Sequence, residues 1–365
     1  MNQDQQYMQL AIQMAQTTTG QTTPNPHVGA VVVKDGEVLG MGAHLKAGGP
    51  HAEVHALQMA GERAVGATIY VTLEPCSHYG KTPPCAELIV QSGIQRVVVA
   101  TLDPNPQVAG RGVRRIREAG IEVEIGVLEK EADELNQVFY HWIANKTPYV
   151  TLKTAMSLDG KIATTTGESQ WITGTEARED VHQYRHTHDG ILVGVNTVIH
   201  DGPKLTTRLP HGGKNPVRIV LDTHLRTPID TPLIQSPEAP TWIVTGSDVE
   251  QDQINHFRQY GHVEVVKLSS SNISIEEVLR VLGEKGITSL FVEGGAQVND
   301  AFVRAGAVNQ VIQYIAPKLI GGKTAPTPIT GEGIAKLSEA ISLKIEGVIQ
   351  LGQDIKIVAK PVEQE

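Results

Sequence analysis

The sequence predicts an α/β protein of two domains, and three features support that prediction. The chain has 365 residues, more than one ordinary domain usually holds. Short apolar strands alternate with helical segments, a pattern typical of largely parallel sheets covered by helices. The pattern is interrupted once, near Asn145 to Pro148, and then restarts. We therefore expect one domain over residues 1–145 and another over residues 149–365.

The expected elements of the first domain begin with a helix over residues 6–16. VGAVVV and the segment after Asp35-Gly36 form a hairpin, because Asp-Gly is a strong signal for a tight turn. The next elements are the helix AEVHALQMAG, the strand ATIYVTLEPC, the helix CAELIVQSG, the strand RVVVATLDPNP, the helix GVRRIREAG and the strand IEVEIGV. This order predicts a layered domain with a largely parallel sheet.

The second domain follows the helical run EKEADELNQVFYHWIANK and starts with the strand YVTLKTAMSLDG. Further strands are DGILVG, PVRIVLD, TWIVTG, HVEVVKL and TSLFVEGG, with helices between several of them. From about Val308 the chain is rich in strands. That end predicts antiparallel strands closing an otherwise parallel sheet.

Composition limits the classes of function. The formal net charge of -9 argues against a broad nucleic-acid-binding face. The N-terminus lacks the features of a signal peptide, and no apolar run is long enough to span a bilayer. These features predict a soluble cytoplasmic protein without a membrane partner. The only cysteines, Cys76 and Cys85, are too few for a disulfide framework and indicate a metal or redox role.

A metal site is predicted from His51 and the two cysteines. A catalytic zinc takes three nitrogen or sulfur ligands and leaves its fourth position to water. It lowers the pKa of that water from about 15.7 towards about 7. Glu53, two residues after His51, is then the candidate to move protons from the water to a departing amine. Cys85 opens a helix, whose N-terminus should favour the Cys85 thiolate.

This arrangement resembles the zinc nucleobase deaminases, whose signature is His-x-Glu followed by Pro-Cys-x-x-Cys. It departs from that signature because eight residues separate Cys76 from Cys85. His55 is a rival ligand at helical spacing, but Glu53 is misplaced for a His-Glu-x-x-His motif, so a structural role is favoured. Buried cysteines with no metal are the simpler alternative, which the order of all four residues disfavours.

Other glycine motifs do not predict nucleotide sites by themselves. Gly80-Lys81-Thr82 and Gly322-Lys323-Thr324 lack the first glycine of a P-loop, since Pro75 and Pro317 occupy that position. Neither Gly40-Met-Gly42 nor Gly110-Arg-Gly112 has the third glycine of a Rossmann fingerprint. A strand that ends in Glu293-Gly294-Gly295 before a helix could still approach a dinucleotide phosphate closely.

The segments TPNPHVGAVVV, GAHLKAGGPHAEVHAL, VTLEPCSHYGKTPPC and DPNP resemble the deaminase half of the bifunctional riboflavin-biosynthesis deaminase/reductase family. The resemblance implies a cytidine-deaminase-like three-layer fold and a diaminopyrimidinone ribosylamine 5′-phosphate as substrate. It implies substrate contacts at Asn25, His44, His78, Lys81, Asp103 and Asn105. Lys81 would be the natural phosphate ligand, since its ammonium is a compact charge.

The segments LKTAMSLDGKIAT, SQWITG, YRHTHDGILVGVNTVIHDGPKLTTR, NPVRIVLDT and VEGG resemble the reductase half of the same family. The resemblance implies a dihydrofolate-reductase-like fold that uses NADPH. It implies cofactor contacts at Ala155, Trp171, Thr197, Asp201, Thr223, Gly295, Ala296, Gln297, Val298, Asn299, Asp300 and Ala301. It implies substrate contacts at Ser169, Arg185, Leu205, Arg208 and Glu293.

The residue types are consistent with reductase chemistry. Arg185 and Arg208 could grip a substrate phosphate bidentately, although either one alone is as readily a surface charge. Lys153 could polarise the imine or carbonyl form of the sugar while the cofactor delivers hydride.

We expect two sequential reactions: hydrolytic removal of an exocyclic amine, then reduction of the ribosyl group to ribityl. The family resemblance also implies a homo-oligomer, a dimer or a tetramer. Two alternatives stay open. A deaminase of tRNA or a free nucleobase would be expected to have a basic face, unlike this acidic chain. A zinc-stabilised binding module would usually have four protein ligands.

Overall fold

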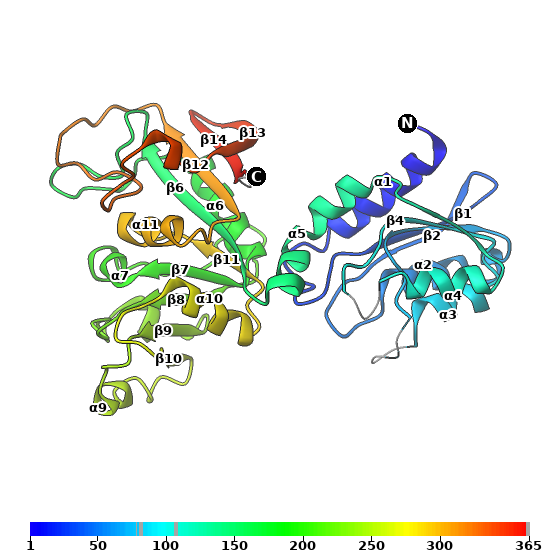
Figure 1. Cartoon of the computed structure of the whole chain (residues 1–365), viewed down its shortest axis with the longest axis horizontal. Helices are drawn as coiled ribbons and strands as arrows, with labels where there is room; N and C mark the ends of the chain where they lie inside the picture. Colours follow the sequence, from blue (N-terminus) through cyan, green and yellow to red (C-terminus); the bar gives the residue numbers. More distant parts are fainter. Residues whose placement is uncertain (78, 80–82, 106–108, 363–365) are drawn as a thin grey trace. The chain divides into compact units, whose positions relative to one another are not determined.

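The computed structural model describes residues 1–77, 79, 83–105 and 109–362. The chain divides into two compact units, Met1–Lys146 and Thr147–Glu365. Figure 1 shows the helices and strands of each unit. In the described part of the chain, no helix combines the length and the apolar character needed to cross a bilayer.

The first unit is built on a five-stranded sheet in the order β2-β1-β3-β4-β5. The strands are β1 (Gly29–Lys34), β2 (Glu37–Ala43), β3 (Thr68–Leu73), β4 (Arg96–Thr101) and β5 (Glu122–Ile125). β3, β4 and β5 run parallel, whereas β1 is antiparallel to both β2 and β3. β2, β3, β4 and β5 therefore run in one direction and β1 is reversed, so this sheet is largely parallel as expected, with the Asp35-Gly36 hairpin as its antiparallel part.

Helices cover both faces of this sheet (Figure 1). α1 (Gln3–Gln16) and α5 (Glu129–Asn145) lie on one face. α2 (Ala52–Ala60), α3 (Cys85–Gln91) and α4 (Arg111–Glu118) lie on the other, and the turn η1 (Gly61–Ala64) follows α2. Alternate strand side chains enter the two cores, as the two-residue period of a strand requires. The result is the expected three-layer domain.

Close packing fixes α2, which carries the proposed proton carrier. A Cβ atom at Gly40 on β2 would lie 2.1 Å from the carbonyl oxygen of Ala56. Only glycine lets the helix backbone approach the strand this closely. The middle of α2 is therefore held against the sheet.

The second unit contains a nine-stranded sheet in the order β10-β9-β8-β7-β11-β6-β12-β14-β13. Its strands are β6 (Tyr149–Ser157), β7 (Gly190–Gly194), β8 (Val217–Leu221), β9 (Thr241–Thr245), β10 (Val263–Lys267), β11 (Ser289–Val292), β12 (Gln310–Ala316), β13 (Leu343–Leu351) and β14 (Asp354–Pro361). Only the pairs of β14 with β12 and β13 are antiparallel. β12 was expected to belong to the antiparallel end, but it pairs parallel to β6.

The helices of this unit are α6 (Thr175–Thr187), α7 (Val195–Asp201), α8 (Pro232–Gln235), α9 (Gln251–Asn255), α10 (Ile275–Glu284) and α11 (Ala296–Arg304), with the short turn η2 (Leu337–Glu339). α10 and α11 pack on one face of the sheet, and α6 and α7 on the other. β7 and β11 are neighbours, and α7 and α11 begin just after them. The carboxyl ends of parallel strands are where open α/β sheets bind ligands.

Candidate active sites

Three side chains in the first unit converge as a metal site requires. The Nδ1 atom of His51 lies 3.6 Å from the Sγ atom of Cys76 and 3.3 Å from that of Cys85. Ligands held 2.0–2.3 Å from a tetrahedral zinc lie about 3.5 Å apart. The donor set and its spacing therefore fit zinc. His55 is not part of this group.

Local backbone structure brings these ligands together. His51 precedes α2 in an extended conformation, so its side chain is not held to a helical direction and can lie beside that of Glu53, in the first turn of the helix. Cys76 follows the end of β3, and Cys85 is the first residue of α3. The backbone N–H of Cys85 donates to the Sγ atom of Cys76 over 3.3 Å. Each ligand thus lies at the end of an element, where the backbone direction changes.

The charges of the site are set by burial and hydrogen bonding. Hydrogen bonding from Cys85 lowers the pKa of the Cys76 thiol to about 4, whereas the same contact raises the pKa of Cys85. The expectation that the helix N-terminus favours the Cys85 thiolate stays a prediction, and the first N–H group of α3 donates to the Sγ atom of Cys76.

Glu53 is buried beside the ligands, being 3% exposed. Burial raises its pKa to about 7. Within the described residues, its Oε2 atom has no hydrogen-bond partner. A buried carboxyl oxygen without a partner is costly unless a ligand satisfies it. Glu53 is therefore arranged to exchange a proton with a bound molecule.

Asn25 and His44 form a hydrogen-bonded pair next to this centre. The Nδ1 atom of His44 lies 3.0 Å from the carbonyl oxygen of Pro50, so it carries the proton. Its Nε2 atom can then accept from the Nδ2 atom of Asn25, which is 3.0 Å away. This bond leaves the Oδ1 atom of Asn25 to accept from a ligand. The ring of His44 meets that of His51 edge to face, with the centroids 5.4 Å apart.

The loop that carries Asn25 is held by a residue that the sequence analysis missed. The side chain of Asn136, on α5, accepts from the backbone N–H of His27 and donates to its carbonyl oxygen. Asn136 is 1% exposed. A lone asparagine in a helical pattern gives no sequence signal for such a role.

Two other predicted substrate residues follow β4. Asp103 accepts a hydrogen bond from the backbone N–H of Asn105 over 2.8 Å, which closes a local turn. His78 and Lys81 lie outside the described residues.

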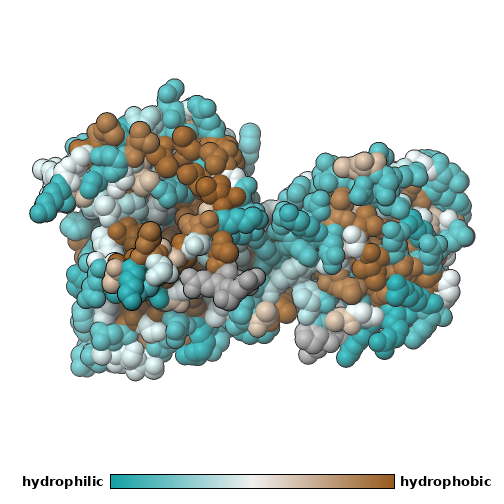
Figure 2. Space-filling view, turned by 45° about the horizontal axis from the view of Figure 1, so that its top comes forward, coloured by the Kyte–Doolittle hydropathy of each residue, from teal (hydrophilic) through white to brown (hydrophobic). Residues whose placement is uncertain are grey.

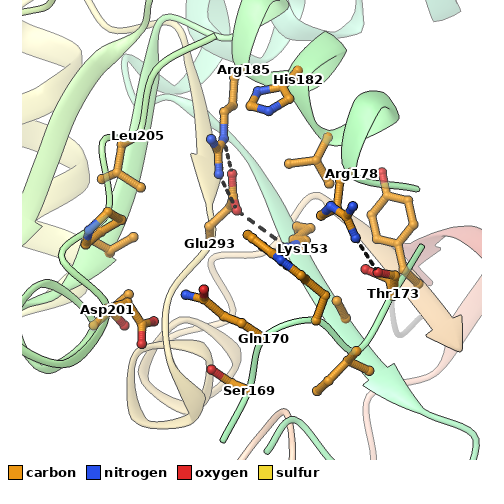
Figure 3. Close-up of a pocket in the computed structure, with 18 of the residues that line it drawn as sticks. Lys153, Ser169, Gln170, Thr173, Arg178, His182, Arg185, Asp201, Leu205 and Glu293 are labelled. Atoms are coloured by element: carbon orange, nitrogen blue, oxygen red, sulfur yellow. Dashed lines mark hydrogen bonds and ion pairs between the residues drawn. The ribbon is translucent and has the colours of Figure 1, made fainter. Parts of the chain in front are cut away.

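The second unit has a cavity of about 820 Å³ at the carboxyl ends of its strands. Figure 3 shows side chains that line it. They come from β6, from α6, from the turn before α11, and from the loops around Gln170 and Leu205. Nine predicted residues line it: Ala155, Ser169, Trp171, Arg185, Thr197, Asp201, Leu205, Arg208 and Glu293.

Glu293 is the centre of the charged part of this cavity (Figure 3). Its carboxylate binds Arg185 through two hydrogen bonds of 2.7 and 3.0 Å, and Lys153 lies 3.5 Å away. Burial alone would raise the pKa of Glu293, but Arg185 and Lys153 hold it at about 2. The Nε and Nη2 groups of Arg185 each donate to Glu293, and its Nη1 group donates to the carbonyl oxygen of Thr206 over 3.3 Å. The expected grip of Arg185 and Arg208 on a phosphate stays a prediction.

The turn from Gly295 to Ala301, which was expected to contact the cofactor, lies only partly at the cavity. A Cβ atom at Gly295 would lie 3.6 Å from the Oγ1 atom of Thr197, so the start of the turn faces the lining. The side chain of Asn299 donates to the carbonyl oxygen of Pro328 instead, and Asp300 pairs with Arg304. The residues expected to contact the cofactor but absent from the lining are Thr223, Gly295, Ala296, Gln297, Val298, Asn299, Asp300 and Ala301.

The sequence analysis missed two residues of α6 that line the cavity. Arg178 and His182 precede Arg185 by seven and three residues, so the three share one face of the helix. Arg178 stacks on Trp171, 4.7 Å from the ring centroid. Burial, with Arg185 and Arg208 nearby, lowers the pKa of His182 to about 4. The helical spacing was a signal that could have found both residues.

Comparison with known proteins identifies the family. Residues 148–357 match the RibD C-terminal domain, and residues 1–101 match the cytidine and deoxycytidylate deaminase zinc-binding region. The riboflavin biosynthesis protein RibD of Bacillus amyloliquefaciens is 52% identical over 98% of this chain and 96% of its own length. The Escherichia coli (strain K12) protein of the same name is 41% identical over 97% and 98%, respectively. The chain belongs to the RibD family.

Solved structures of this family share the fold. RibD of Acinetobacter baumannii superimposes with a TM-score of 0.88 at 40% identity, covering 99% of both chains. A diaminohydroxyphosphoribosylaminopyrimidine deaminase/5-amino-6-(5-phosphoribosylamino)uracil reductase from Thermotoga maritima gives 0.88 at 38% identity, covering 98% of this chain and 99% of its own. The expected fold classes of both halves are confirmed.

The chain is therefore a bifunctional riboflavin-pathway enzyme that acts as a hydrolytic deaminase and as a reductase on small-molecule substrates. The cofactors of the two activities are zinc and NADPH. These matches favour the leading hypothesis over a deaminase of tRNA and over a non-enzymatic zinc module.

Proposed function

We propose that residues 1–145 catalyse hydrolytic deamination of 2,5-diamino-6-(5-phosphoribosylamino)pyrimidin-4-one. Residues 149–365 then reduce the ribosyl group of 5-amino-6-(5-phosphoribosylamino)uracil to ribityl with NADPH. The observation that best supports this assignment is the convergence of His51, Cys76 and Cys85 beside a buried Glu53. The two reactions act on related phosphorylated molecules, which gives the fusion a chemical reason.

In the deaminase, His51, Cys76 and Cys85 are the zinc ligands. Zinc, when bound there, acidifies water and so supplies a nucleophile at neutral pH. Glu53 takes a proton at its free carboxyl oxygen and gives one to the departing amine, which leaves as ammonia. Its burial beside the ligands keeps competing water away from this transfer.

The substrate of the deaminase is bound by residues around this centre. The Oδ1 atom of Asn25 accepts a hydrogen bond, because His44 holds the amide in one orientation. Asp103 and Asn105 contact the substrate from the loop after β4. His78 and Lys81 complete the set, with Lys81 on the phosphate.

In the reductase, the cavity holds the substrate and the nicotinamide cofactor, which supplies the hydride. Lys153, on β6, polarises the imine or carbonyl form of the sugar from its place beside Glu293. Glu293 positions Lys153 and Arg185 and contacts the substrate. Arg208 binds the phosphate, while Ser169, Arg185 and Leu205 bind other parts of the substrate.

Residues at the carboxyl ends of β6, β7, β8 and β11 would hold the cofactor. Ala155, Trp171, Thr197 and Asp201 contact it from the cavity. Thr223 and the turn from Gly295 to Ala301 contact it from beyond the lining, where the N-terminus of α11 favours a phosphate.

The protein forms homo-oligomers, dimers or tetramers, through the second unit. β13 is the edge strand of the nine-stranded sheet, and Ile345 and Val348 on it are 60% and 62% exposed. Figure 2 shows apolar patches on the surface of this unit. An exposed apolar edge strand is suited to pairing with a second copy. The two thiolate ligands favour a reducing compartment such as the cytoplasm.

Replacement of a zinc ligand tests the assignment. Cys76→Ala in the full chain should lose the bound zinc and ammonia release, because only two of three protein ligands remain. NADPH oxidation with the deaminated substrate should stay within about twofold, since independent sites do not couple. Zinc retained at one ion per chain in this variant would contradict the assigned ligand set.

A further inference from the structure

A buried glutamate outside the zinc ligand set connects β3 to the loop after β4. Glu74 follows β3 directly and is 4% exposed. Its carboxylate accepts four backbone N–H groups, and no ion pair of Glu74 occurs among the described residues. A buried carboxylate with no cation beside it persists only where hydrogen bonds satisfy its oxygens. Glu74 is satisfied in this way.

The two oxygens of Glu74 hold two different parts of the chain. Oε2 accepts from the N–H groups of Asp103 over 3.3 Å and Gly110 over 2.8 Å, which are the two ends of one loop. Oε1 accepts from Gly112 over 2.9 Å and Val113 over 3.2 Å, in the first turn of α4. α4 has no side-chain cap of its own. Glu74 therefore satisfies helix donors that would otherwise lack partners.

Close backbone contact makes the same connection. A Cβ atom at Gly112 would lie 1.9 Å from the carbonyl oxygen of Pro75. Pro75 stands between Glu74 and the zinc ligand Cys76. The Gly110-Arg-Gly112 motif, which lacks the third glycine of a Rossmann fingerprint, thus brings α4 against the end of β3.

The loop held by Glu74 carries two proposed substrate residues. Asp103 donates its backbone N–H to Glu74, and its own carboxylate accepts from the N–H of Asn105. The side chain of Asp103 therefore holds the backbone of Asn105 in place, and Glu74 in turn holds the backbone of Asp103.

We infer that Glu74 is a positioning residue of the deaminase, which fixes the Asp103 end of the loop so that Asp103 and Asn105 stand at the substrate. This inference rests on the proposed function, which assigns these two residues to substrate binding.

The experiment is Glu74→Gln in the full chain loaded with zinc. A glutamine keeps one acceptor oxygen but turns its amide N–H groups towards two backbone donors. The KM for the deaminase substrate should rise about tenfold, as loss of one or two buried hydrogen bonds predicts, while kcat changes less than about threefold. Zinc content and NADPH oxidation should be unchanged. Glu118→Gln, the same change on the exposed end of α4, should leave the KM unchanged.

Gly112→Ala is the second variant, because its added Cβ forces α4 away from Pro75 and Glu74 while the Glu74 carboxylate itself is kept. It should raise the same KM. If Glu74 only stabilised the fold, both variants would contain a smaller fraction of active protein. The kcat would then fall while the KM stayed constant. That result would overturn the inference. Hydrogen exchange in the unaltered protein provides a check independent of folding of the variants. The amides of Asp103 and Gly110 should be protected, and rapid exchange at both would overturn the inference.

Asn105→Ala separates this inference from the proposed function. If Asn105→Ala raises the KM but Glu74→Gln and Gly112→Ala do not, the substrate assignment stands and the positioning role fails. If Asn105→Ala and Asp103→Ala leave the KM unchanged, the assignment of this loop to the substrate fails, and the inference with it.

Discussion

The two sites of this chain are built in different ways. The zinc site takes its ligands from the ends of elements within a span of 35 residues, His51 to Cys85. The reductase cavity collects residues from Lys153 to Tyr314, across most of the second unit. The first site depends on a few directed donors, whereas the second depends on a network of charges. This difference determines which substitutions should damage each site and which residues the sequence could reveal.

The two sites also differ in the charge state of their buried carboxyl groups. Glu53 is buried with no ion pair to another described residue, and its pKa is raised to about 7. Glu293 is also buried, yet Arg185 and Lys153 hold its pKa at about 2. One carboxyl group is thus prepared to carry a proton, and the other is fixed as an anion. Environment, not residue type, separates the two roles.

The largest expected effect comes from removing the fixed anion. Glu293→Ala leaves Arg185 and Lys153 buried without their counter-charge, which should destabilise the second unit by about 3–5 kcal/mol. Reductase activity should fall by at least about a hundredfold, because Lys153 and Arg185 lose their fixed positions. Urea unfolding and NADPH oxidation measure both effects. Glu332→Ala, at an exposed loop position, is the control, and an equal loss there would contradict the account.

A smaller effect is expected from Asn136→Ala in the first unit. The variant leaves the N–H and carbonyl groups of His27 without their partner, at a cost of about 1–3 kcal/mol. The loop carrying Asn25 should loosen, so the KM of the deaminase should rise several-fold while zinc content stays the same. Gln91→Ala, at an exposed position in the same unit, should change neither quantity. Loss of zinc from Asn136→Ala would show that the loop and the metal site are not separable.

An effect of similar size, seen only when the pH is lowered, concerns His188 of the second unit. Its Nδ1–H donates to the carbonyl oxygen of Tyr184, and its Nε2 accepts from the hydroxyl of Thr151. Burial lowers its pKa from 6.5 to about 4. Between these values the unfolded chain binds a proton that the folded chain does not, so stability falls as pH decreases from 6.5 to about 4.

Unfolding of the His188→Gln variant measures this contribution. Glutamine does not titrate, so the loss of stability between pH 7 and pH 4.5 should be smaller than in the unaltered chain by roughly 2–3 kcal/mol. Comparing the two proteins at both pH values cancels the other histidines. An equal loss in both proteins would mean that His188 does not titrate with the shifted pKa.

The sequence predicted the elements and the zinc group well for a physical reason. His51, Cys76 and Cys85 sit at the junctions of regular elements, and such junctions follow from hydrophobic periodicity and turn residues. The strand pairing was harder, because β12 joins the sheet beside β6 from far along the chain. No local pattern distinguishes a parallel partner from an antiparallel one at that distance.

The reductase cavity was predicted mainly through family resemblance. Glu293 and Arg185 are 108 residues apart, and nothing in the sequence pairs them. The role of Arg185 as a phosphate ligand was inferred without knowledge of this pairing, which only the folded chain reveals. Arg178 and His182 could have been found from their helical spacing to Arg185. Glu74 and Asn136 could not, because their partners are backbone groups.

The most direct measurement uses Glu53→Gln in the full chain, with zinc content, ammonia release and NADPH oxidation recorded on the same sample. The variant should retain its zinc and its reductase rate, while ammonia release falls by at least about a hundredfold, the usual contribution of a proton carrier. Ammonia release close to that of the unaltered enzyme, or equal loss of both activities in a folded, zinc-loaded protein, would contradict two independent sites.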